Sequence, residues 1–131
     1  MAAVRERPMS PHLSIWRWGP HMVVSILHRI TGVGLSIAGL AVLTWWLMAI
    51  SGNADDYSAF TDAASGWFGK LVLIGLTWAF FQHLFSGIRH LVMDTGMGFE
   101  LKANKTGAVL TIVGSIAATI LLWAYWLGAL K

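Results

Sequence analysis

The sequence contains no cysteine, and only 11% of its 131 residues are charged. Without cysteine the chain cannot form a disulfide, a zinc–thiolate site or an iron–sulfur site from its own side chains. A soluble globular domain has about 25% charged residues, so the low charge argues against one. The net charge of +3 is small and falls on both ends of the chain, and we therefore expect no nucleic-acid partner.

Apolar residues are abundant instead: 56% of the chain is hydrophobic, and eight residues are tryptophan. Residues 22–50, 67–93 and 106–130 are each apolar enough for a helix that crosses a bilayer, which takes roughly 20 residues. Backbone groups in lipid must be paired within the span, which excludes an open three-stranded sheet. The sequence predicts an all-α integral membrane bundle of three transmembrane helices, forming one anchor domain over residues 1–131.

The two connections, residues 51–65 and 94–105, contain glycine, asparagine and acidic residues and predict loops. Basic residues are unequally divided between the two sides of such a bundle, and they favour the cytoplasm. The bias therefore predicts a cytoplasmic N-terminus and a periplasmic C-terminus. Seven would lie inside, namely Arg5, Arg7, Arg17, Arg29, Arg89, Lys102 and Lys105, and two outside, namely Lys70 and Lys131.

Two clusters of polar residues interrupt the apolar stretches at the predicted inner half of the bilayer. The first comprises Ser25, His28, Arg29 and Gly32, and the second comprises His83, Gly87, Arg89, His90 and Asp94. In a helix, His83, Gly87 and His90 share one face. Ionisable groups in hydrocarbon cost at least a few kcal/mol each, so another group inside the bundle must compensate them.

A haem would account for both clusters. An imidazole on a helix can be an axial ligand of haem iron, and Gly87 would leave room for the macrocycle. Arg29, Arg89, His28 and His90 are placed to pair with its propionates.

Simpler interpretations of these residues remain open from the sequence alone. His83 could bond a neighbouring helix, Ser25 could bond the carbonyl four residues back, and Arg89 with Asp94 could mark a helix end that reaches water. The small residues Gly32, Ser36 and Gly39 predict close helix packing.

Three strings in the chain, RPMSPHLSIWRW, SILHRITG and HLFSGIRHLVMD, resemble the cytochrome b membrane-anchor subunit of succinate dehydrogenase (respiratory complex II). They lie in the family's order within residues 7–94, and the third apolar stretch also fits. SILHRITG combined with HxxxGxRHLxxD is specific to the family. The chain departs from it at Trp16, where many members have tyrosine, and at Gln82, where an aromatic residue is common.

The resemblance implies a haem b-binding subunit of succinate:quinone oxidoreductase, working in electron transport and the tricarboxylic acid cycle. His83 would be the axial ligand of one haem, shared with a companion anchor subunit that donates the other ligand. His28, Arg29 and His90 would lie at the propionates or the haem edge. Ser25 and Arg29 would bind ubiquinone, the substrate.

The resemblance further implies that iron–sulfur and flavoprotein subunits carry out succinate oxidation, which this chain alone is not expected to perform. The short N-terminus favours a multi-pass protein of the bacterial inner membrane over a mitochondrial precursor. Three other functions remain open: an anchor for a different quinone-linked enzyme, a self-contained cytochrome with His28 and His83 as both ligands, and a structural or transport subunit without haem.

Overall fold

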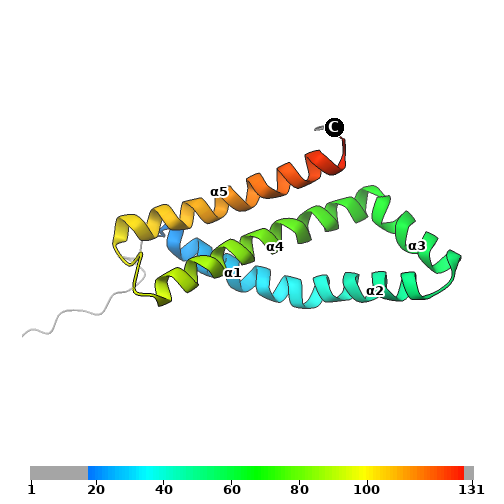
Figure 1. Ribbon diagram of the computed structural model, residues 1–131, viewed down its shortest axis with the longest axis horizontal. Coiled ribbons are helices and arrows are strands. Elements are labelled where there is room, and N and C mark those ends of the chain that lie inside the picture. The colour runs from blue at the N-terminus through cyan, green and yellow to red at the C-terminus, as the bar shows by residue number, and fades with distance from the viewer. Residues whose placement is uncertain (1–17, 129–131) are drawn as a thin grey trace, which may run out of the picture.

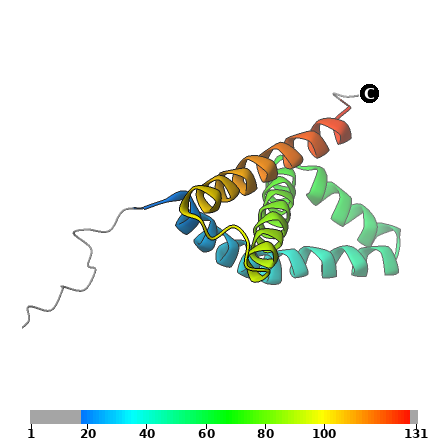
Figure 2. The ribbon, with the colours of Figure 1, turned by 60° about the vertical axis from the view of Figure 1, so that its left-hand side comes forward.

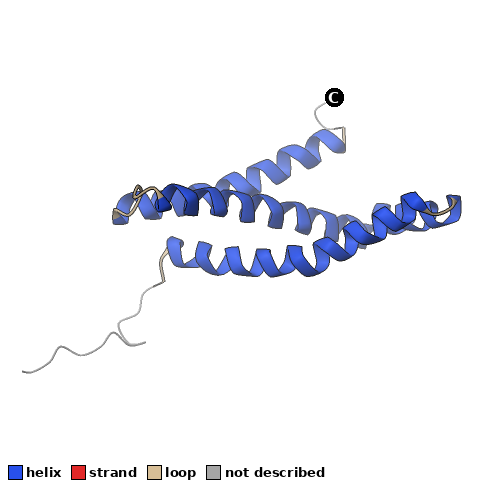
Figure 3. Ribbon diagram, turned by 60° about the horizontal axis from the view of Figure 1, so that its bottom comes forward, coloured by secondary structure: helices blue, strands red, loops and turns tan. Residues whose placement is uncertain are grey.

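The computed structural model describes residues 18–128, in which the regular elements are all helices (Figures 1 and 3). Along the chain they are α1 (Pro20–Gly34), η1 (Leu35–Gly39), α2 (Leu40–Ser51), α3 (Ala54–Ser65), α4 (Trp67–Asp94) and α5 (Leu101–Trp126). Several predictions fall outside the described range, namely the N-terminal string up to residue 17, the cations Arg5, Arg7 and Arg17, and Lys131.

Three helical segments are long and apolar enough to cross a membrane, which confirms the predicted all-α, three-span architecture. The first is the continuous run Pro20–Ser51 of 32 residues, and the others are Trp67–Asp94 and Leu101–Trp126. The third span begins at Leu101, before its predicted start at residue 106, and ends at Trp126. The connection between the last two spans is therefore shorter than expected, and Gly96 and Gly98 turn it with positive φ angles of 87° and 78°.

The prediction of a loop at residues 51–65 was wrong, because α3 occupies most of this connection. The side chain of Asn53 accepts hydrogen bonds from the backbone N–H groups of Asp55 and Asp56, at 2.9 and 3.0 Å. The Asp56 carboxylate accepts in return from the Asn53 N–H at 3.1 Å, which completes a capping box. Two carboxylates in the first turn also suit the positive end of the helix dipole.

The first span is not a uniform α-helix. It contains one π-helical segment, η1, between α1 and α2, and the helix changes direction there (Figure 2). Such segments are a known cause of kinks. On the N-terminal side of the bend, α1 packs against α4 and α5. On the C-terminal side, α2 packs against α3, which in turn contacts α4. The bend thus separates the half of the span that carries His28 from the half that carries Trp45 and Trp46.

Helix α4 is central, because it packs against α1, α3 and α5, and α1 also contacts α5. Its contact with α5 is polar: the Ser115 hydroxyl donates to Gln82 Oε1 at 2.7 Å, and Trp123 Nε1 donates to Thr77 Oγ1 at 3.3 Å. Gln82, Ser86 and Ser115 are fully buried. Large apolar side chains point outwards, as expected where lipid rather than water surrounds the helices.

Candidate functional site

His83 lies in α4, and one of its ring nitrogens is bound to the backbone of α1. Its Nδ1 is 3.1 Å from the carbonyl oxygen of His28 and 3.3 Å from the hydroxyl of Thr31. A carbonyl oxygen only accepts, so Nδ1 must carry the ring proton in this contact. The other nitrogen, Nε2, then has a free lone pair, which is the form of histidine that binds a metal.

Gly32 makes room for this imidazole. A Cβ atom at Gly32 would lie 2.9 Å from Cε1 of His83, closer than such contacts normally come. The ring of His83 therefore lies directly against the backbone of α1. The sequence predicted only close helix packing for Gly32. The structure shows that the space left by its missing side chain is filled by the His83 ring. Gly87, in contrast, faces the His28 ring, and a Cβ there would be at an ordinary contact distance of 3.8 Å.

Three imidazoles meet between α1 and α4. The rings of His28 and His83 stack, with centroids 3.9 Å apart and planes 8° from parallel. His90 meets His28 edge to face, with centroids 5.2 Å apart. Nδ1 of His28 is buried and has no hydrogen-bond partner within residues 18–128. The structure thus brings together the three histidines that the sequence analysis singled out.

Ser25 and Arg29 lie one turn apart on α1, the helix that also carries His28. Ser25 is half-buried and Arg29 is exposed. Neither forms a hydrogen bond or ion pair with another part of the described chain, so the Ser25 hydroxyl is not bound to the carbonyl four residues back. Both side chains are available to a group outside this subunit.

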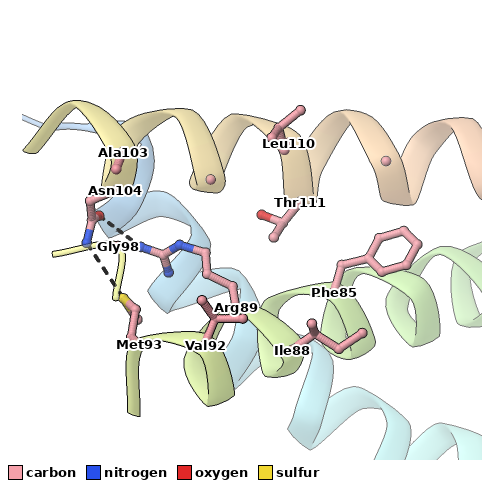
Figure 4. A pocket seen from close by; sticks show the side chains of 12 residues that line it. Phe85, Ile88, Arg89, Val92, Met93, Gly98, Ala103, Asn104, Leu110 and Thr111 are labelled. Atoms are coloured by element: carbon pink, nitrogen blue, oxygen red, sulfur yellow. Dashed lines mark hydrogen bonds between the residues drawn. The ribbon is translucent and has the colours of Figure 1, made fainter. Parts of the chain in front are cut away.

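Arg89 points towards α5 rather than towards the histidine cluster, contrary to what we expected for it. Its Nη2 donates to Oδ1 of Asn104 in α5 at 2.8 Å, and Asn104 Nδ2 lies 3.7 Å from the sulfur of Met93. These three residues lie at one end of a groove of about 470 Å³ between α4 and α5 (Figure 4). Leu110 and Thr111 lie further along it. Arg89 therefore stabilises the α4–α5 pair and does not join the histidine cluster.

Comparison with protein families shows to which family this chain belongs. The model of the family described as "Succinate dehydrogenase/Fumarate reductase transmembrane subunit" matches residues 3–122, almost the whole chain. The chain belongs to this family. The strings on which the resemblance rested lie within the matched range.

Individual members of the family agree with the match. A Rickettsia felis protein named "Succinate dehydrogenase cytochrome b556 subunit" is 42% identical over 118 residues, covering 90% of this chain and 91% of that protein. A Paracoccus denitrificans protein of the same name is 36% identical over 116 residues, covering 88% of each. The human mitochondrial "Succinate dehydrogenase cytochrome b560 subunit" is 30% identical over 119 residues, covering 88% of this chain and 69% of its own length.

With bacterial cytochrome b556 relatives and three spans, the chain is a multi-pass protein of the bacterial inner membrane and a cytochrome b subunit of succinate dehydrogenase. The sequence analysis missed two contacts, one made by Thr31 and one made by Gln82. Thr31, inside the string SILHRITG, was not singled out, because its contact with His83 depends on how α1 and α4 pack. Gln82 was noted only as a departure from the family, whereas its buried bond to Ser115 joins α4 to α5.

Proposed function

We propose that this subunit binds haem b through His83 and forms part of the ubiquinone site of succinate dehydrogenase. The observation that carries the proposal is the bond between Nδ1 of His83 and the backbone carbonyl of His28. A ligating histidine usually has its second nitrogen held in this way, which orients the ring and fixes its tautomer. The same ring also packs against the backbone of α1 at Gly32, where the missing side chain leaves room for it.

The donor set fits a haem better than a bare ion. Residues 18–128 contain no group of three or more histidine or carboxylate side chains arranged to hold a metal. A haem iron already has four ring nitrogens and takes only axial ligands from protein, so one histidine here and one from a companion anchor subunit suffice. When bound, the haem supplies a centre that accepts and releases one electron.

His28, Arg29 and His90 are the candidates for the haem edge and the propionates. Nδ1 of His28 is buried and has no hydrogen-bond partner among the described residues, which supports this role because such an atom normally has one. Arg29 is exposed on this chain and can donate to a carboxylate without breaking an existing bond.

Ser25 and Arg29 also form this chain's part of the quinone site. The Ser25 hydroxyl donates to a quinone carbonyl oxygen, and the Arg29 guanidinium stabilises negative charge that develops on that oxygen during reduction. In a membrane interior an unpaired arginine is costly, and an anionic reaction partner would offset that cost. Succinate oxidation itself would belong to flavoprotein and iron–sulfur subunits that this chain anchors at its cytoplasmic end.

Replacing His83 tests the haem assignment. The assembled His83→Ala complex should lose its b-type optical spectrum, or show a strongly shifted one, with a lower ratio of haem to protein. An unchanged spectrum at an unchanged ratio would exclude His83 as the ligand. The proposed orientation, with the N-terminus in the cytoplasm, predicts that a reporter fused after Lys131 reads as periplasmic.

A further inference from the structure

The hydroxyl of Thr31 is a buried polar group at this site. The proposed function gives it no role. Its side chain is 3% exposed. Oγ1 lies 2.7 Å from the carbonyl oxygen of Leu27, 3.1 Å from that of His28 and 3.3 Å from Nδ1 of His83. The hydroxyl therefore lies between the backbone of its own helix and the imidazole of the facing one.

The protons in this group can be assigned from the acceptors. Thr31 has a single hydroxyl proton, which goes to a carbonyl of its own helix, the shorter contact being to Leu27. Its oxygen then presents a lone pair to the Nδ1–H of His83, which already points at the His28 carbonyl. The imidazole N–H is thus shared between a backbone oxygen and a side-chain oxygen, both from α1.

We propose that Thr31 is a positioning residue for the axial histidine. By accepting from Nδ1–H it keeps the ring in one rotation and one tautomer, and it makes Nε2 a stronger electron donor. A stronger donor favours the ferric form of a haem, so the Thr31 hydroxyl lowers the reduction potential. This inference rests on the proposed function, in which His83 is the ligand.

A threonine bonded to its own helix is common and needs no functional role. Thr119 provides the matched case, because it is also buried and its hydroxyl donates to the carbonyl four residues back, at 2.8 Å. The difference is that Thr31 faces an imidazole and Thr119 does not. A threonine-to-valine change at each position removes one hydroxyl at nearly constant shape and separates the two situations.

The experiment compares Thr31→Val, Thr31→Ser and Thr119→Val in the assembled complex. The readouts are haem content, the midpoint potential from a redox titration and the electron paramagnetic resonance of the ferric haem. Thr31→Val should raise the midpoint potential and shift the resonance, while Thr31→Ser and Thr119→Val stay close to the wild type. Loss of one hydrogen bond changes the ratio of the histidine's affinities for ferric and ferrous haem iron by up to about tenfold. For one electron, this corresponds to a shift of the midpoint potential of about 59 mV.

The outcomes distinguish this inference from the proposed function. If His83→Ala loses haem but Thr31→Val has a wild-type potential and resonance, Thr31 is structural and the inference fails alone. If His83→Ala keeps its haem, the proposed function fails as well. A shift in Thr31→Ser but not in Thr31→Val would assign the effect to packing of the methyl group and also overturn the inference. If Thr31→Val does not assemble, Thr31→Ala removes the same hydroxyl and is measured instead.

Discussion

The imidazole rings of His28 and His83 lie face to face, 3.9 Å apart and 8° from parallel. Two axial ligands of one iron approach it from opposite sides of the macrocycle, with their nitrogens pointing towards each other. Stacked rings have neither property. The geometry therefore argues against a self-contained cytochrome in which His28 and His83 are the two ligands.

Replacing His28 should leave the haem bound. The group that holds Nδ1 of His83 is the backbone carbonyl of His28, which a side-chain substitution does not remove. We expect His28→Ala to retain most of its haem and to shift the midpoint potential, as measured by redox titration. His28→Phe keeps a ring for stacking, so a similar shift in both variants would assign the effect to the imidazole nitrogens. Complete loss of haem from an assembled His28→Ala complex would contradict this assignment.

Two glycines of α1 should respond differently to alanine. At Gly34 a Cβ would meet nothing within 4 Å, so Gly34→Ala should stabilise the helix by up to about 1 kcal/mol. At Gly32 the same change forces the His83 ring to move, and overpacking of this kind costs about 1–3 kcal/mol. Haem content and optical spectrum should change in Gly32→Ala and remain normal in Gly34→Ala. Identical behaviour of the two variants would show that His83 does not depend on this contact.

Ser25 and Arg29 should affect the quinone reaction and not the oxidation of succinate. Ser25→Ala removes one hydrogen bond and should slow ubiquinone reduction about fivefold to tenfold. Arg29→Leu removes a charge close to the developing anion and should slow it about 100-fold or more. Lys70→Leu, at the other end of the bundle, is the control. Reduction of an artificial dye that accepts electrons upstream should stay normal in all three.

The quinone assignment has a clear way to fail. If assembled Ser25→Ala and Arg29→Leu complexes both reduce ubiquinone at the wild-type rate, with subunit content confirmed, these two residues have no part in the quinone site. A parallel fall in the dye assay would instead point to damaged assembly.

The bond between Gln82 and Ser115 should stabilise the contact between α4 and α5. Bonds between membrane helices contribute about 0.6 kcal/mol on average, and up to about 1.7 kcal/mol. A double-mutant cycle with Gln82→Leu and Ser115→Ala, followed by unfolding in detergent, should give a coupling energy in this range. Ser51→Ala, where an exposed hydroxyl bonds its own helix at 3.0 Å, should have almost no effect. A coupling energy of zero would mean that close packing alone holds the two helices together.

Hydropathy was sufficient to predict the three spans, because lipid imposes a length and an apolar composition on any helix that crosses it. It was not sufficient for α3, whose small and acidic residues have the composition of a loop. The information was nevertheless present locally, since Asn53 followed by Asp56 is the spacing of a capping box. A search for helix starts, independent of hydropathy, would have found this helix.

The site was predictable to the extent that it lies on single helix faces. Spacing and the family resemblance singled out His28, His83 and His90, and the structure brings them together. The contacts of Thr31 and Gly32 with His83 depend on the register between α1 and α4, which one sequence does not encode in any readable pattern. Arg89 was misplaced because it was grouped with its neighbour His90, although adjacent helical residues point about 100° apart.

The π-helical segment η1 divides the first span into two parts that are joined in sequence but independent in packing. Compared with an unbroken α-helix, one additional residue in the turn rotates every later side chain by about 100° around the axis. Spacings of three or four residues therefore lose their meaning across Leu35–Gly39. Deleting one residue there would restore an ordinary α-helical turn, so the outer half, with Trp45, would keep its present orientation relative to His28. Within this family, chimaeras joined at η1 would thus exchange the outer half without altering the surroundings of His28.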